Sequence, residues 1–420
     1  MFIRRNSLDS RNINRERRKR QLKSRIINSQ ETDAPKRGFL RGRRKVVLAI
    51  FAALCIILAA GFLYIDNKHY TGYSVAWERE LEHGDTGTES FKGYESFCGG
   101  VISYSKDGAS YTNSEGKVIW ERSYEMTNPI ISVCGEYAAI ADRGSHNIYI
   151  FNDDINTGAA ESVLPITKIA VSGQGIVYAV LRDSEADYIT AFNNDGSAVV
   201  LSIKSVLTGD GYPFDISVSP DGTQLISSYY KLDGSNVVTS VIFRNFGEVG
   251  ESADARKVVG GFSEEFQGHI PGRVHFSDNT YSQAVYDGGI VFFSTKVLNS
   301  PEIIKTITFE EEINSVAFSD DYVGIILNQE SAEMPYRLEI YKKNGGKIST
   351  VEFDYQYDSF EIDGGYVLLY TENSCRVYNT GGKEKLSADF DLQVSKMIKG
   401  RFPGEFLLVG NNVMQKIKMR

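Results

Sequence analysis

The chain has 420 residues, more than a single hydrophobic core usually serves, so we expect several domains or one large modular architecture. Hydrophobic residues make up 42% of it and charged residues 24%, which excludes a wholly disordered protein. The net charge of −8 is unevenly divided. Residues 1–45 carry 16 Lys and Arg against 4 Asp and Glu, whereas the rest of the chain carries 30 against 50. Such opposed segments indicate two compartments.

Residues 1–45 contain dense basic clusters at 15–20 (RERRKR) and 41–45 (RGRRK) and no sustained apolar periodicity. The first interpretation is a disordered cytoplasmic tail that acts as an orientation signal. The second is attraction to anionic lipid headgroups, and the third is binding to nucleic-acid phosphates. No aromatic residue stands between Phe2 and Phe39, so base stacking has no support. We therefore expect a topology signal with lipid contacts and no nucleic-acid partner.

Residues 46–65 read VVLAIFAALCIILAAGFLYI, twenty positions without a charge. A helix of this length spans about 30 Å, the thickness of a bilayer's hydrocarbon core. The basic residues at 41–45 precede it directly, which places the N-terminus in the cytoplasm. The competing interpretation is a cleaved signal peptide, but such peptides have a shorter apolar region and a shorter basic one. We predict an uncleaved single-pass transmembrane helix at 46–65, a linker at 66–72 and an extracytoplasmic remainder.

Beyond the linker, short apolar or alternating runs are separated by Gly, Asp, Asn and Ser turns, the pattern of antiparallel strands. A five-residue turn pattern recurs eight times between positions 96 and 401, at spacings of 36 to 58 residues. The third residues of its copies are Cys98, Cys134, Ser172, Ser219, Ser277, Ser319, Asp363 and Lys399. Four strands per period of about 40–45 residues are typical of a β-propeller blade. We predict an all-β, eight-bladed propeller over 73–420, with seven blades as the fallback.

The two ends of this region predict how the ring closes. The eighth unit has three strands before the chain stops, so its outer strand must come from elsewhere. Residues 75–79 (VAWER) closely match residues 118–122 (VIWER), the outer strand of the first blade, which places Trp77 and Trp120 at one repeat position. We expect the segment around Trp77 to complete the last blade and leave no free sheet edge.

Residues 109–120 (ASYTNSEGKVIW) resemble the quinoprotein-type propeller repeat, whose consensus contains Gly-Lys-x-x-Trp. Residues 219–222 (SPDG) resemble a turn of other propeller families. The whole layout resembles an uncharacterised family of membrane-anchored propeller proteins from Gram-positive bacteria. That resemblance implies a fold and a place in the cell envelope, but no activity.

Enzymatic motifs are missing from the sequence. Quinone-dependent dehydrogenases of this propeller type use a vicinal Cys pair, and this chain has no Cys-Cys dipeptide. It also lacks a P-loop, a Gly-x-Ser-x-Gly motif and Cys-x-x-Cys spacing. We therefore predict no catalytic residue, no cofactor and no metal site. The alternative is a quinoprotein-like oxidoreductase or a hydrolase that has lost recognisable motifs.

Cys98 and Cys134 share one repeat position on neighbouring inner strands. A disulfide between the two blades and a pair of buried thiols both remain open, because equivalent inner-strand positions can lie beyond the roughly 7 Å Cα limit for a disulfide. The histidines are scattered, and His269 and His275 have a spacing that suits no known helix-borne metal pair. We expect a structural or solvent-facing role for both.

The linkers from each fourth strand to the next inner strand converge on one face of a propeller. Those at 209–213, 310–312 and 354–358 predict an acidic rim that bears tyrosines. Solubility explains the charge, but Tyr clusters on loops are also typical of binding surfaces. The candidate partner-binding residues are Tyr212, Glu311, Tyr355 and Tyr357. We expect a non-enzymatic scaffold or sensor that binds an envelope protein, peptide or glycan.

Overall fold

A computed structural model of the chain describes residues 15–23, 47–48, 50–54, 68–80, 92–154, 158–253, 255–331 and 333–420. The chain divides into two compact units, Met1–Lys68 and His69–Arg420. In the first unit, residues 15–23, 47–48 and 50–54 are helical and exposed. The rest of the predicted tail, most of the predicted span at 46–65 and Cys55 lie outside the described residues. Among the described residues, no helix is long and apolar enough to cross a membrane.

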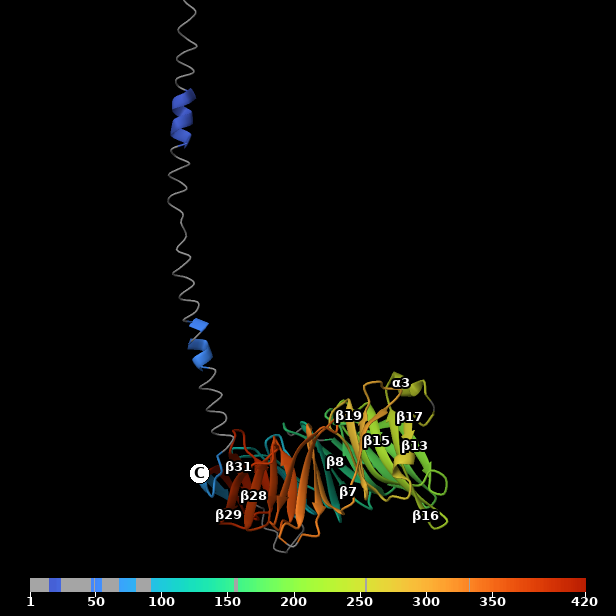
Figure 1. Cartoon of the computed structure of the whole chain (residues 1–420). Coiled ribbons are helices and arrows are strands. Elements are labelled where there is room, and N and C mark those ends of the chain that lie inside the picture. The colour runs from blue at the N-terminus through green and yellow to red at the C-terminus, as the bar shows by residue number, and fades with distance from the viewer. Residues whose placement is uncertain are drawn as a thin grey trace, which may run out of the picture. The chain divides into compact units, whose positions relative to one another are not determined.

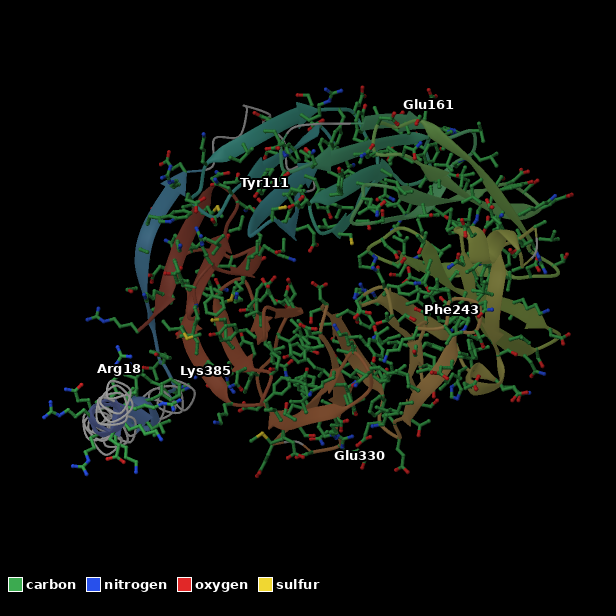
Figure 2. The ribbon with its side chains drawn as sticks, turned by 90° about the horizontal axis from the view of Figure 1, so that it is seen from above. Arg18, Tyr111, Glu161, Phe243, Glu330 and Lys385 are labelled. Atoms are coloured by element: carbon green, nitrogen blue, oxygen red, sulfur yellow. The ribbon has the colours of Figure 1, made fainter. Side chains whose placement is uncertain are left out.

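The second unit is an all-β propeller, with eight antiparallel four-stranded sheets in the described residues (Figure 1). Figure 2 shows these blades following one another around a common axis. In most consecutive blades the first strands contact each other, which places them nearest the axis. The prediction of eight blades is confirmed, and the seven-bladed fallback is not needed.

The first four blades follow the chain. Blade 1 consists of β2 (Lys92–Phe97), β3 (Gly100–Ser105), β4 (Gly108–Thr112) and β5 (Val118–Ser123). Blade 2 consists of β6 (Pro129–Cys134), β7 (Tyr137–Asp142), β8 (Asn147–Asn152) and β9 (Gly158–Glu161). Blade 3 consists of β10 (Ile166–Val171), β11 (Val177–Arg182), β12 (Ala186–Phe192) and β13 (Ala198–Val206). Blade 4 consists of β14 (Tyr212–Val218), β15 (Gln224–Asp233), β16 (Asn236–Asn245) and β17 (Val258–Phe262).

The last four blades continue the order until the final one. Blade 5 consists of β18 (Pro271–Phe276), β19 (Tyr281–Tyr286), β20 (Gly289–Ser294) and β21 (Glu302–Thr308). Blade 6 consists of β22 (Ile313–Phe318), β23 (Tyr322–Asn328), β24 (Tyr336–Lys342) and β25 (Lys347–Phe353). Blade 7 consists of β26 (Ser359–Asp363), β27 (Tyr366–Tyr370), β28 (Ser374–Asn379) and β29 (Glu384–Asp389). Blade 8 consists of β30 (Lys396–Lys399), β31 (Glu405–Val409), β32 (Val413–Met419) and β1 (Tyr73–Glu80).

Blade 4 is the irregular blade. Its middle strands β15 and β16 are ten residues each, and the connection 246–257 between β16 and β17 contains the short helix α3 (Glu248–Glu251). A 3₁₀ turn, η1 (Glu264–Phe266), follows β17. These additions account for the long 58-residue spacing between the fourth and fifth copies of the repeated turn.

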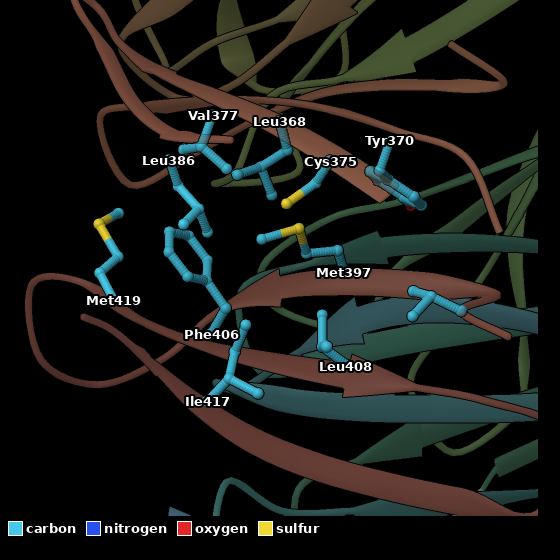
Figure 3. Packing of buried hydrophobic residues seen from close by; sticks show 11 residues of the cluster. Leu368, Tyr370, Cys375, Val377, Leu386, Met397, Phe406, Leu408, Ile417 and Met419 are labelled. Carbon is cyan, nitrogen blue, oxygen red and sulfur yellow. The ribbon is translucent and has the colours of Figure 1, made fainter. Parts of the chain in front are cut away.

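The hydrophobic core lies between the blades. In the described residues each apolar cluster joins two consecutive blades, because the two faces of a blade pack on its two neighbours. Figure 3 shows the contact between blades 7 and 8, where Leu368 and Val377 meet Met397 and Phe406. The cluster between blades 8 and 1 is small, with Val101 against Ile398, Leu407, Val409 and Met414. The contact between blades 8 and 1 therefore buries fewer apolar residues than the contact between blades 7 and 8.

The outer strand of blade 8 comes from the N-terminal side, as expected. Strand β1 pairs antiparallel with β32 from Tyr73 opposite Met419 to Glu80 opposite Val413. Trp77, within β1, also reaches the turn between β4 and β5 of blade 1, because a Cβ built on Gly116 would lie 2.8 Å from its ring. Trp120 contacts the following blade in the same way: its Nε1 donates to the Asn152 carbonyl at 3.0 Å. Trp77 therefore joins the fourth strand of blade 8 to blade 1, and Trp120 joins the fourth strand of blade 1 to blade 2.

Candidate functional site

One face of the propeller carries the linkers that lead from the fourth strand of a blade to the first strand of the next. We call these linkers and the loops between second and third strands the rim face. The antiparallel order of every blade places all of them at the same end of the ring. The linkers that the structure describes span 124–128, 162–165, 207–211, 263–270, 309–312, 354–358 and 390–395.

The described rim linkers are acidic, apart from 162–165 (SVLP), which carries no charge. None of them contains Lys or Arg. Their ten carboxylates are Glu125, Asp210, Glu264, Glu265, Glu310, Glu311, Glu312, Asp354, Asp358 and Asp391. The described loops between second and third strands add seven Asp and Glu and two Lys and Arg.

The opposite face has a mixed charge. Its described turns, which join first to second and third to fourth strands, contain 11 Asp and Glu against 7 Lys and Arg. Solubility alone gives no reason for the basic residues to be scarce on one face, because charge on either face keeps a protein in solution. A surface that carries one sign of charge instead attracts partners of the other sign.

Of the four predicted rim residues, Tyr355 and Tyr357 are half-buried. The Tyr355 hydroxyl donates to the Ser374 carbonyl at 2.9 Å, and the Tyr357 hydroxyl donates to the side-chain oxygen of Asn314 at 2.7 Å. Both rings pack against the cluster between blades 6 and 7. Their contacts hold the linker 354–358 in place and leave little of either ring for a partner.

Glu311 is engaged within the chain as well. Its carboxylate accepts a hydrogen bond from Arg337 at 2.6 Å, and this bond holds the pKa of Glu311 below its usual value. The same guanidinium lies 3.2 Å from the carboxylate of Glu339, which is buried. Glu311 therefore links its linker to blade 6, while its neighbours Glu310 and Glu312 remain exposed.

Tyr212 is the exposed member of the predicted set. It belongs to an aromatic cluster with Phe214 and Tyr230, in which Tyr212 and Phe214 are 37% and 36% exposed. Tyr212 stacks on Tyr230 with ring centroids 5.5 Å apart, and Phe214 meets Tyr230 edge-on at 6.2 Å. The cross-strand pairing of Tyr212 with Tyr230 brings the rings together. The cluster stands at the rim end of β14 and β15, beside the acidic linker 207–211.

The chain itself shows that these rings accept cations. The guanidinium carbon of Arg182 lies 5.8 Å from the centroid of the Tyr212 ring, and the Lys168 ammonium lies 5.5 Å from that of Phe214. Each cation also has a carboxylate partner: Arg182 pairs with Asp187 at 2.9 Å, and Lys168 pairs with Asp215 at 3.3 Å. Aromatic rings beside carboxylates are a suitable environment for Lys and Arg side chains.

A buried ion cluster lies where the ring closes. Lys396, on β30, has a side chain 9% exposed and pairs with Glu361 of blade 7 at 2.9 Å and Glu95 of blade 1 at 3.4 Å. Burial lowers the pKa of Lys396, but the two carboxylates outweigh burial and raise this pKa above its usual value. Tyr370 donates to Glu361 at 2.6 Å. The cluster joins three blades, so its clearest role is structural.

A family model described as a family of unknown function, DUF5711, matches residues 66–419. The chain belongs to this family. No protein among the curated proteins matches it.

Solved propellers are similar in structure to this DUF5711 protein. The Dos1 propeller is 8% identical, with a TM-score of 0.51, and the match covers 83% of this chain and 94% of that one. Apo AztD from Citrobacter koseri is 10% identical, with a TM-score of 0.49, over 72% of this chain and 87% of that one. At such identities the likeness to the Dos1 propeller shows the fold alone.

The thiols at the repeated turn are free in the structure. Cys98 is exposed and Cys134 is half-buried, so neither the disulfide nor the expectation of two buried thiols describes them. Partial desolvation of the sulfur atoms raises the pKa of both Cys98 and Cys134 to about 11, so each thiol stays protonated at neutral pH and is a poor nucleophile. Cys98 borders a cavity of about 320 Å³ that also contacts Asp363 and Lys399.

The sequence did not single out Phe214 and Tyr230. An available signal was the alternation of aromatic residues at positions 212 and 214, which places both on one face of a strand. Their partner Tyr230 was not predictable, because a register shift between Pro213 and Asp215 decides which residue of β15 stands opposite. In the described residues, no three His, Cys, Asp or Glu side chains gather in a way that could hold a metal ion.

Proposed function

We propose that this protein is a membrane-anchored, non-enzymatic binding module in the cell envelope. Its propeller lies outside the membrane, and its rim face binds a cationic segment of a protein or peptide at the blade 4 aromatic cluster, Tyr212, Phe214 and Tyr230. The protein acts as a scaffold or sensor through this contact.

The sequence supports the anchor. The twenty uncharged residues at 46–65 follow the basic cluster at 41–45, and this order places the tail in the cytoplasm. Near the inner leaflet each Lys or Arg of the tail contributes about 1 kcal/mol of attraction to anionic headgroups. The tail therefore fixes the orientation and adds a lipid contact.

The exposed aromatic cluster is the observation that carries the binding function. Isolated exposed apolar residues are normal, but two aromatic side chains that share a cluster and stay more than one-third exposed offer a ready anchor for a partner. The cluster is positioned by pairing between β14 and β15, so it is preorganised. Little conformational entropy is lost when a partner binds to such a surface.

The chemistry around the cluster favours a basic partner over a neutral glycan. The rim linkers carry carboxylates and no cation in the described residues, and a field of this kind speeds the approach of positive segments. The aliphatic stem of a Lys or Arg packs on an aromatic ring while its head group reaches a carboxylate. Rim contacts of this type affect the association rate and its salt dependence most strongly.

A peptide titration tests the proposal. The full chain in detergent is titrated with a fluorescent Lys-rich peptide and with a Glu-rich peptide of equal length, and anisotropy is measured. We expect binding of the Lys-rich peptide alone, weakened by added salt because exposed charges are screened. The variant with Tyr212→Ser and Phe214→Ser should lose about tenfold in affinity.

The matched control is Phe402→Ser, which removes an aromatic residue that is 56% exposed on the opposite face. This variant should bind as the native chain does. Equal binding of the Glu-rich peptide, or unchanged affinity in the Tyr212 and Phe214 variant, contradicts the proposal. The enzymatic alternative instead predicts a cofactor absorption band or a bound metal in the purified protein.

A further inference from the structure

The side of blade 4 contains a cavity of about 340 Å³ that is separate from the aromatic cluster. Its floor is formed by side chains of β15 and β16 on the face opposite to Tyr230, and its edges come from the linker 207–211 and the connection 246–257. Figure 1 shows α3, part of this connection, beside β17. The size lies at the lower end of the range for small-molecule pockets, about 300–1,000 Å³.

Arg244 is the unusual residue of this cavity. It is 5% exposed, although its guanidinium is always charged. One nitrogen, Nη1, donates to the Ser227 hydroxyl at 2.8 Å, and the guanidinium lies 5.5 Å from the centroid of the Tyr229 ring. Its Nε is buried without a hydrogen-bond partner. Among the described residues, no carboxylate pairs with it.

Two other enclosed cations of the propeller, Lys396 and Arg337, have carboxylate partners. Lys396 has two carboxylate partners, and Arg337 pairs with Glu311 and Glu339. A buried charge without a counter-ion costs free energy, so such charges in proteins are paired with opposite charges or bound ligands. Among the described residues, Arg244 therefore lacks the carboxylate partner that Lys396 and Arg337 possess, and it faces a cavity.

Two further cations border the same cavity. Arg256 pairs with Asp210 at 3.0 Å, and the Lys231 ammonium donates to the Gly209 carbonyl at 3.0 Å. With Arg244 they make three positive charges against the one carboxylate of Asp210, a net charge of +2. This excess contrasts with the acidic rim. A phosphate monoester carries a charge of about −1.5 to −2 at neutral pH and accepts several hydrogen bonds, which matches this excess.

The remaining walls fit an organic body attached to the anionic group. Val238, Ile242 and Val258 provide apolar surface, and Ser240 and Ser263 add hydroxyl groups. A lone inorganic ion uses only the polar part of such a cavity. We propose that the blade 4 cavity binds a small organic phosphate monoester, with Arg244 as the buried anchor for the phosphate.

This site is independent of the proposed rim function, and calorimetry tests it. The full chain in detergent is titrated with glycerol 3-phosphate, with inorganic phosphate and with glycerol. We expect heat of binding from glycerol 3-phosphate, weaker binding of inorganic phosphate and none of glycerol, together with a rise in Tm on adding glycerol 3-phosphate. Absence of binding by both phosphates at about 10 mM, a concentration at which even weak millimolar sites fill, overturns the proposal.

Arg244→Met is the decisive variant. It should lose about tenfold or more in affinity for glycerol 3-phosphate, because the charged, forked donor is removed. Without ligand it should keep or raise the Tm of the native chain, since an unpaired buried charge is gone and Ser227 retains its bond to the Ile242 carbonyl. The matched control Arg337→Met should lower the Tm, because Glu339 is then left with one fewer partner.

Two results overturn the assignment of Arg244. One is unchanged phosphate affinity in Arg244→Met. The other is a fall in its ligand-free Tm as large as that of Arg337→Met, which assigns Arg244 a purely structural role. The variant with Tyr212→Ser and Phe214→Ser should keep its phosphate affinity, so failure of the rim proposal and failure of this one are distinguishable.

Discussion

His275 is a half-buried side chain that the fold keeps neutral. It lies on the inner strand β18 and stacks on Phe318 of blade 6, with ring centroids 4.8 Å apart. Its Nε2 is buried without a hydrogen-bond partner. Burial, reinforced by the positive charge of Arg273, lowers the pKa of His275 from 6.5 to about 4. The sequence predicted a structural or solvent-facing role for this residue but gave no indication of its titration, because the stacking partner comes from another blade.

A pH profile of stability tests this environment. The unfolded chain protonates His275 below about pH 6.5 and the folded chain only near pH 4, so the stabilisation is present above 6.5 and is lost as the pH falls to 4. The loss attributable to His275 is at most about 3 kcal/mol. Urea unfolding of His275→Leu from pH 7 to 4 should show a flatter profile than the native chain.

Carboxylates also titrate in part of the range between pH 7 and 4 and change the stability of every variant. The test therefore compares the pH profile of His275→Leu with that of a second histidine variant. His269→Leu removes an exposed histidine of the neighbouring linker and should not flatten the profile. If His275→Leu and the native chain lose stability in parallel, His275 is not held neutral by the fold.

Whether the role of a residue could be predicted from the sequence depended on whether its contacts lie nearby in the chain. The acidic character of the linkers was visible in the sequence, because charge needs no knowledge of register. The exposure of Tyr355 and Tyr357 was not, because the acceptors of their hydroxyls, Ser374 and Asn314, belong to other segments. Arg244 was not singled out either, since its lack of a carboxylate is a property of the folded neighbourhood.

At the scale of elements, strand β1 is the piece that closes the ring. It pairs with β32, and Trp77 extends from it to the turn around Gly116 in blade 1. Gly116 has a φ of +73°, a conformation that glycine adopts without strain. The sequence predicted this closure from the similarity of 75–79 to 118–122. It did not reveal the β-bulge between Val75 and Trp77, because a bulge is defined by the register with the partner strand β32.

Gly116→Ala should weaken this closure. The new methyl group would lie 2.8 Å from the Trp77 ring and 2.6 Å from the Arg79 Cδ, and the residue would be strained at positive φ. We expect a loss of about 2–3 kcal/mol in the free energy of unfolding, from backbone strain and overpacking together. Urea unfolding of the full chain measures it.

Gly144→Ala provides the matched control. Gly144 also has positive φ, at +86°, but a Cβ there would meet nothing within 4 Å. Its loss should therefore be limited to the backbone strain, about 1 kcal/mol. If Gly116→Ala and Gly144→Ala lose the same free energy of unfolding, Trp77 does not pack closely against the Gly116 turn of blade 1.

At the scale of the whole molecule, the repeated turn made the fold predictable. Eight copies at spacings of 36 to 58 residues define eight first strands, and four strands per period leave few other architectures. The long fourth unit was the weak point of that count, and the structure explains it by the extended β15 and β16 and the connection that holds α3. The sequence predicted the acidic linkers on one face, whereas the mixed charge of the opposite face emerged only once its turns could be assigned.

Photocrosslinking in intact cells tests the account most directly. A photoreactive amino acid replaces Tyr212 on the rim face in one full-length variant and Glu136 on the opposite face in another, and the adducts are identified by mass spectrometry. The account predicts that position 212 crosslinks to a Lys- or Arg-rich segment of an envelope protein and that position 136 does not. Crosslinks from position 136 alone, or equal and unselective labelling from both positions, would contradict it.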